Sequence, residues 1–159
     1  MVTSTIKRTT AIFQSKYPAV VLRLLIGIIF VFSAVTKLPM HSQFVTIVES
    51  YHLLPQALAT AYALALPWVE LLTGSYLILG IKIRPSSLVA LLLALSFLVA
   101  NISSAVSGQA FCSSCFGEAI ILPISQALVL DITIIIVAVY IYIEGRQPYS
   151  FDSLFVRQP

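Results

Sequence analysis

The chain has 159 residues, of which 59% are hydrophobic and 9% are charged, and its mean hydropathy is +1.01. A typical soluble domain carries roughly 25% charged residues, so this composition could not cover a folded surface with polar groups. It excludes a soluble globular protein and predicts a chain embedded in a lipid bilayer. Basic residues beside the apolar segments account for the formal net charge of +3, and we expect no nucleic-acid partner.

Four long apolar segments predict four membrane-spanning helices. Each segment is close to the ~20 residues that a helix needs to cross a hydrocarbon core ~30 Å thick. The predicted spans cover about residues 19–36, 57–79, 86–106 and 120–143. The remaining tails and connections are too short to bury a core of their own. We therefore predict an all-α fold, an integral membrane four-helix bundle that forms a single membrane domain over residues 1–159.

Basic residues outside the spans predict their orientation. One predicted side of the membrane carries Lys7, Arg8, Lys16, Lys82, Arg84, Arg146 and Arg157. The connections on the other side contain Lys37 and no further Lys or Arg. By the positive-inside rule, both termini are cytoplasmic in a multi-pass protein of the inner (cytoplasmic) cell membrane. A signal peptide is the alternative for the first segment, but the segment is too long and Arg23 interrupts it.

The connection between the first two spans predicts an amphipathic helix over about residues 42–54. Phe44, Val48 and Tyr51 recur at helical spacing among polar residues, and Pro55 follows. Such a helix lies on the outer surface of the membrane. It either covers the outer end of the bundle above the cysteine-containing connection or serves only as an interfacial anchor.

The two cysteines of the chain, Cys112 and Cys115, form a C-x-x-C motif between the third and fourth spans. The predicted orientation places the motif on the outer face, where disulfides form and persist. Closely spaced cysteines can exchange electrons with other thiols through mixed disulfides, so both are candidate catalytic residues of a thiol-disulfide oxidoreductase. The dipole of the fourth helix favours a thiolate at Cys115, which leaves Cys112 to meet a partner.

Five polar residues lie within or at the end of the apolar spans: Arg23, Lys37, Glu70, Asn101 and Asp131. A charge near the bilayer centre costs on the order of 2.5–3.5 kcal/mol, so such groups face the bundle interior and pair. Counting ~1.5 Å per residue predicts a buried Arg23–Glu70 pair, and a second cluster of Lys37, Asn101 and Asp131 below the cysteines. These groups either lock the helices together or handle protons or a quinone head group.

No cofactor follows from the residues themselves, although a quinone is compatible with the polar interior. His41 and His52 could join the cysteines in a zinc site, but their separation and their place at the bilayer edge oppose it. We expect no metal site.

The order of these landmarks resembles the DoxX-like membrane protein family, most of all its MauE branch. The resemblance covers roughly residues 19–143 and rests on Arg23, Lys37, the motif Leu66-Pro67-Trp68-Val69-Glu70-Leu71 and Cys115-Phe116-Gly117. It implies a four-helix membrane bundle associated with the maturation of an exported, disulfide-rich enzyme subunit. Many relatives carry Cys-x-Cys-Phe-Gly, whereas two serines separate the cysteines here.

Three functions remain open from the sequence. The first is thiol-disulfide redox chemistry or maturation of an exported redox protein, linked to the quinone pool, with a thioredoxin-like or disulfide-rich client as partner. Dedicated disulfide generators use two cysteine pairs, and this chain has one. The second is a scaffold subunit of a larger membrane redox complex, in which the cysteines form a staple. The third is a small proton-coupled transporter with Glu70 and Asp131 as relay.

Overall fold

The computed structural model describes residues 17–51, 53–108, 111–112 and 122–144. Its elements in chain order are α2 (Tyr17–Lys37), the 3₁₀ turn η1 (Leu38–Met40), α3 (His41–Ser50), α4 (Gln56–Leu79), α5 (Ile83–Val106), β1 (Phe111–Cys112), β2 (Leu122–Pro123) and α6 (Ile124–Glu144). Four helices are long and apolar enough to cross a membrane, the first of them continuing into α3. The predicted all-α membrane bundle is therefore confirmed.

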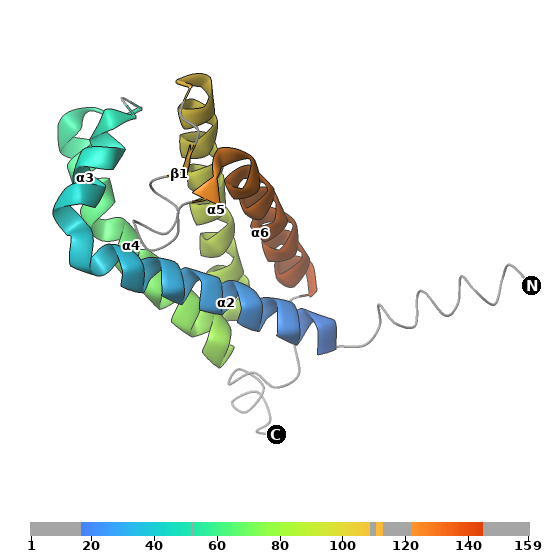
Figure 1. The fold of residues 1–159 in the computed structure, drawn as a ribbon. Helices are drawn as coiled ribbons and strands as arrows, with labels where there is room; N and C mark the ends of the chain where they lie inside the picture. Colours follow the sequence, from blue (N-terminus) through green and yellow to red (C-terminus); the bar gives the residue numbers. More distant parts are fainter. Residues whose placement is uncertain (1–16, 52, 109–110, 113–121, 145–159) are drawn as a thin grey trace, which may run out of the picture.

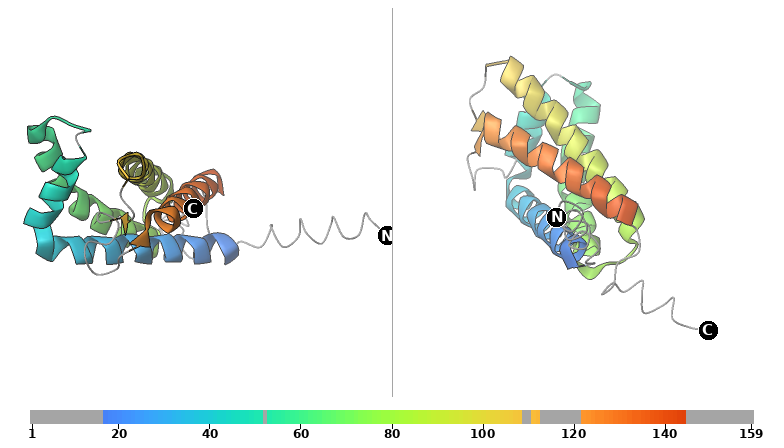
Figure 2. Two further views of the ribbon diagram at one scale, coloured as in Figure 1. Left: turned by 45° about the horizontal axis from the view of Figure 1, so that its top comes forward. Right: turned by 90° about the vertical axis from the view of Figure 1, so that its right-hand side faces the viewer.

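The four long helices are arranged as two pairs. Helix α2 packs along α4, and α5 packs along α6 (Figure 1). The second pair is seen side by side in the right-hand view of Figure 2, with α2 and α4 next to it. Large apolar side chains such as Leu25, Leu72 and Ile136 are exposed on the outside of the bundle, as expected for helices surrounded by lipid.

The α2–α4 pair is held at close range by two glycines. A Cβ atom placed on Gly74 would lie 2.7 Å from the carbonyl oxygen of Gly27, and one on Gly27 would lie 2.7 Å from Cγ1 of Ile78. Small residues at such crossings allow helix backbones to touch inside a membrane. The contact fixes the register of the pair, with Gly27 opposite Gly74.

The α4–α5 connection is a turn of three residues, Gly80 to Lys82. Gly80 ends α4 in the left-handed region at φ 71°, and its N–H donates to the carbonyl of Tyr76 at 2.8 Å. This is the usual helix stop at glycine. Lys82 is also left-handed, at φ 46°, so the chain reverses within the turn and α5 begins at once.

The predicted amphipathic helix is present as α3, which ends at Ser50 rather than near residue 54. It follows α2 after the single turn η1 and packs against α4. The hydroxyl of Thr60 donates a hydrogen bond to Oε1 of Glu49 at 2.7 Å, which ties the two helices together. Phe44 is the buried residue of α3, so this helix contributes a side chain to the bundle interior as well as a surface.

A short strand pair precedes the last helix and was not predicted. Strands β1 and β2 are antiparallel, with Cys112 opposite Leu122. Because Leu122 and Pro123 belong to this pair, α6 begins at Ile124 and not near residue 120 as predicted. The strands pack on the start of α6. The tails with Lys7, Arg8, Lys16, Arg146 and Arg157 lie outside the described residues, and the cytoplasmic placement of the termini stays a prediction.

Candidate functional site

All five polar residues singled out from the spans are buried. The exposed fractions are 2% for Arg23, 1% for Lys37, 0% for Glu70, 1% for Asn101 and 3% for Asp131. Neither lipid nor bulk water can solvate these groups, so each depends on other protein groups for hydrogen bonds and for charge compensation.

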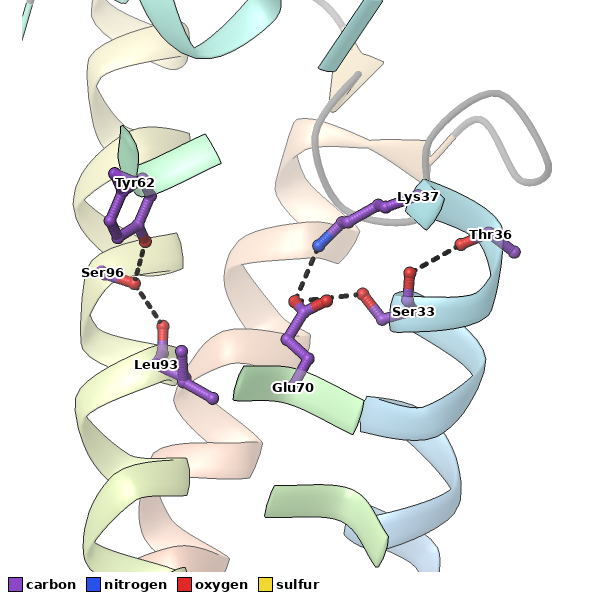
Figure 3. A network of polar contacts seen from close by, with 7 residues as sticks. All are labelled: Ser33, Thr36, Lys37, Tyr62, Glu70, Leu93 and Ser96. Atoms are coloured by element: carbon purple, nitrogen blue, oxygen red, sulfur yellow. Dashed lines mark hydrogen bonds and ion pairs between the residues drawn. The ribbon is translucent and has the colours of Figure 1, made fainter. Parts of the chain in front are cut away.

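Lys37 and Glu70 form a buried ion pair between α2 and α4. The ammonium Nζ of Lys37 lies 2.8 Å from Oε1 of Glu70, and the hydroxyl of Ser33 donates to the same oxygen at 3.3 Å (Figure 3). The ammonium also lies over two aromatic rings, 5.3 Å from the centroid of Phe44 and 4.5 Å from that of Phe97. A cation in this position is attracted to the ring faces, so α2, α3, α4 and α5 all contribute to its site.

The predicted Arg23–Glu70 pair is wrong, because Glu70 pairs with Lys37. The error lies in the register of the two helices. Gly27 lies against Gly74 and Ile78, so Arg23, one turn earlier in α2, lies near the end of α4. Glu70 is about two turns, or ~12 Å, from Ile78 along α4. Counting ~1.5 Å per residue gives the depth of each side chain but not the offset between the two helices, which the glycine crossing sets.

Asn101 and Asp131 meet between α5 and α6, as the sequence predicted. The side-chain amide Nδ2 of Asn101 donates to Oδ2 of Asp131 at 2.7 Å. Ser33, which donates to Glu70, and Phe97, whose ring lies under the Lys37 ammonium, line the same cavity as Asp131. Glu70 therefore joins the predicted group of Lys37, Asn101 and Asp131, and Arg23 does not. We call the residues Ser33, Lys37, Glu70, Asn101 and Asp131 the polar cluster.

Two members of the site escaped sequence reasoning. Ser33 precedes Lys37 by one helical turn, so both lie on the same face of α2, and this spacing was a readable signal. Phe97 carried no such signal, since its role depends on how α5 crosses α2. A second link between the helix pairs joins the hydroxyls of Tyr62 and Ser96 at 2.7 Å (Figure 3).

A small cavity adjoins the polar cluster. It is lined by two polar residues, Ser33 and Asp131, and by five apolar ones, Ile29, Phe30, Phe97, Leu130 and Ile134. Its volume is about 20 Å³, which admits a water molecule but not the ring of a quinone. This cavity therefore has no room for a quinone head group, and we derive no step through one.

Cys112 is 1% exposed and disulfide-bonded. Cys115, the second of the two cysteines in the chain, lies outside the described residues, as does His52. The burial of Cys112 contradicts the prediction that this sulfur is the one to meet a partner. The cause is the β1–β2 pairing, which packs Cys112 against the start of α6. In the described part of the chain no three His, Cys, Asp or Glu side chains come together as metal ligands.

These features define a class: a multi-pass membrane protein in which a buried polar cluster joins two helix pairs. The family model of the methylamine utilisation protein MauE matches residues 15–144, which include all four long helices. The chain belongs to this family. Comparison with curated proteins gives no match, and comparison with solved structures gives none either.

Proposed function

We propose that this protein takes part in thiol-disulfide exchange during the maturation of an exported, disulfide-containing protein, with Cys112 and Cys115 as the reacting pair. The observation that carries the proposal is the disulfide bond of Cys112, held beside the start of a membrane-spanning helix. Membership of the MauE family and the resemblance to DoxX-like proteins support it. The proposal includes an outward orientation of the motif in the inner membrane.

The exchange requires an external thioredoxin-like or disulfide-rich partner with two thiols. A thiolate of the partner attacks one sulfur of the Cys112–Cys115 disulfide, breaks the S–S bond and forms a mixed disulfide. The second thiolate of the partner then attacks the mixed disulfide, so the partner leaves oxidised and both cysteines remain reduced. Two electrons pass from partner to membrane protein. Because Cys112 is buried, Cys115 is the sulfur that we propose for the first attack.

Thiol trapping in intact cells tests this proposal. A membrane-impermeant maleimide should label the cysteines from outside only after reduction, and their redox state should follow the supply of partner thiols. When the partner is supplied in its oxidised form, the Cys115 thiolate of Cys112→Ser should attack the partner disulfide and accumulate the same mixed disulfide, whereas Cys115→Ser should accumulate little. Equal trapping by both variants contradicts the assignment of Cys115, and labelling from the cytoplasm overturns the orientation.

The burial of Cys112 also favours a second function, in which the disulfide is a structural staple and the protein is a scaffold subunit of a larger membrane redox complex. Buried cysteines are usually inert. In that case both serine variants should lower thermal stability to a similar extent, and the disulfide should not turn over when partner thiols are added. A transporter would behave differently again, since it should fail in Glu70→Gln and tolerate the loss of both cysteines.

A further inference from the structure

We propose that Asp131 is a proton-binding site inside the membrane, with the Lys37–Glu70 ion pair as its fixed surroundings. This site does not involve the cysteines, so its test is independent of the thiol-disulfide function.

Among the described residues, the charges of the polar cluster do not balance. Lys37 is the cation beside both carboxyl groups: its ammonium pairs with Glu70 at 2.8 Å and lies over the ring of Phe97, which lines the same cavity as Asp131. All three ionisable side chains are at most 3% exposed. An uncompensated charge in such a place is costly, and a single bound proton makes the cluster neutral. In addition, Oε2 of Glu70 accepts no hydrogen bond from the described residues, so the cluster lacks the donors that two carboxylates require.

The hydrogen bonds indicate which carboxyl group takes the proton. Oε1 of Glu70 accepts from the ammonium of Lys37 and the hydroxyl of Ser33, and a charge-assisted bond of this kind holds a carboxylate in its anionic form. Oδ2 of Asp131 accepts from the neutral amide of Asn101. Asp131 therefore has the weaker compensation, and the proton belongs there.

Asp131 also lies beside a cavity and next to an amide that can bond to either of its protonation states. This residue and Ser33 line the cavity, which is large enough for a water molecule, while Glu70 is not among the lining residues. The Asn101 amide carries both donor and acceptor atoms. It can donate to the Asp131 carboxylate and, after rotation, accept from the protonated acid. One neighbour thus serves both states of Asp131.

The groups that face Asp131 come from each helix packed against it. Helix α5 presents Asn101, and α2 presents Ser33 and the ammonium of Lys37, behind which lies Glu70 of α4. Arg23 lies ten residues before Ser33 in α2, about 15 Å along the axis. Its charge is too remote to replace the proton.

Infrared difference spectroscopy of the full chain in lipid nanodiscs tests the site. The whole sequence has six Asp and Glu residues, so few carboxyl groups contribute. A pH step should change a carboxylic-acid carbonyl band, which shifts in D₂O. Asp131→Asn should abolish this band, whereas Glu70→Gln should retain it. Glu144→Gln, which changes an exposed carboxyl group on the same helix, is the matched control and should leave the band unchanged.

The spectra of these variants distinguish Asp131 from Glu70 as the residue that binds the proton. A band that survives in Asp131→Asn and disappears in Glu70→Gln moves the proton to Glu70 and overturns the assignment. A wild-type protein without any such band overturns the site itself. Circular dichroism of each variant verifies the helical fold, and Glu70→Asp provides a second variant that keeps the anion if Glu70→Gln does not fold. The Cys112→Ser/Cys115→Ser double variant should keep the band, whatever the outcome of thiol trapping.

Discussion

The two helix pairs of this bundle use different means to hold together. Helices α2 and α4 cross at Gly27 and Gly74, so close that no Cβ atom fits. Lys37 of α2 and Glu70 of α4 form an ion pair between them. Helices α5 and α6 bury alanines, among them Ala94 and Ala127. Their central polar contact joins an amide to a carboxyl group.

We call α2–α4 the fixed pair and α5–α6 the adaptable pair, because their central polar contacts tolerate different numbers of protonation states. An ion pair with aromatic rings over its cation has one satisfactory protonation state, and the glycine crossing has one satisfactory register. An amide–carboxyl contact works with the carboxyl group either charged or neutral. We therefore expect changes in α2–α4 to cost more stability than equivalent changes in α5–α6.

The largest effect is expected from Lys37→Met, which removes the cation from the fixed pair. Glu70 would be left charged at 0% exposure, and breaking a buried pair in this way costs about 3–5 kcal/mol. Reversible unfolding in mixed micelles measures the loss. Lys82→Met is the control, because Lys82 is exposed in the α4–α5 turn and its replacement should change the free energy of unfolding by less than about 0.5 kcal/mol. Equal behaviour of the two variants would refute the importance of the ion pair.

Gly74→Ala should come next. Its Cβ would lie 2.7 Å from the Gly27 carbonyl oxygen and 2.9 Å from Cγ2 of Val31. The backbone oxygen cannot move unless the helix moves, so we expect a loss of about 2–3 kcal/mol from overpacking, measured by the same unfolding experiment. Ser75→Ala is the neighbouring control, since the Ser75 hydroxyl bonds only to Leu71 of its own helix in the described contacts. A neutral Gly74→Ala variant would mean that the crossing is looser than described.

Asn101→Ala tests the adaptable pair. It removes the donor to Asp131 and should cost about 1 kcal/mol, in the range of hydrogen bonds between membrane helices. The cost stays small because Asp131 can take a proton instead of remaining a bare anion. Thr133→Ala, on the exposed face of α6, serves as control. A loss as large as that of Lys37→Met would remove the distinction between the two pairs.

The smallest effect is expected from Thr60→Val, which removes the bond to Glu49 that ties α3 to α4. We expect a loss of roughly 0.5 kcal/mol, with faster hydrogen exchange confined to the amides of α3. Thr46→Val is the matched control, because the Thr46 hydroxyl bonds to Ser42 within α3 itself. Unchanged exchange in Thr60→Val would show that the apolar contacts of α3, those of Phe44, Val45 and Val48, hold it without this bond.

Hydropathy was sufficient to predict the four spans, since the cost of leaving backbone or polar groups in lipid allows few alternatives. The same cost predicted that Asn101 and Asp131 would meet. The partner of Glu70 was missed because it depends on helix register, which the glycine crossing sets. Lys37 was expected in the inward cluster with Asn101 and Asp131, but nothing considered in the sequence indicated that it pairs with Glu70.

A readable signal for Lys37 nevertheless existed in α2. Arg23, Phe30, Ser33 and Lys37 recur at spacings of three, four and seven residues and are all buried. Lys37 therefore continues the inward stripe of the helix rather than ending it. The strand pair β1–β2 had no comparable signal, because each strand has two residues and their pairing depends on the fold around them.

The three-residue turn from Gly80 to Lys82 has a consequence for the topology of the protein. A connection this short cannot cross a hydrocarbon core ~30 Å thick, so the end of α4 and the start of α5 lie on the same side of the membrane. The far ends of both helices therefore reach the opposite side. The two helices form a hairpin with a single orientation, and the side of the membrane that receives Lys82 decides it.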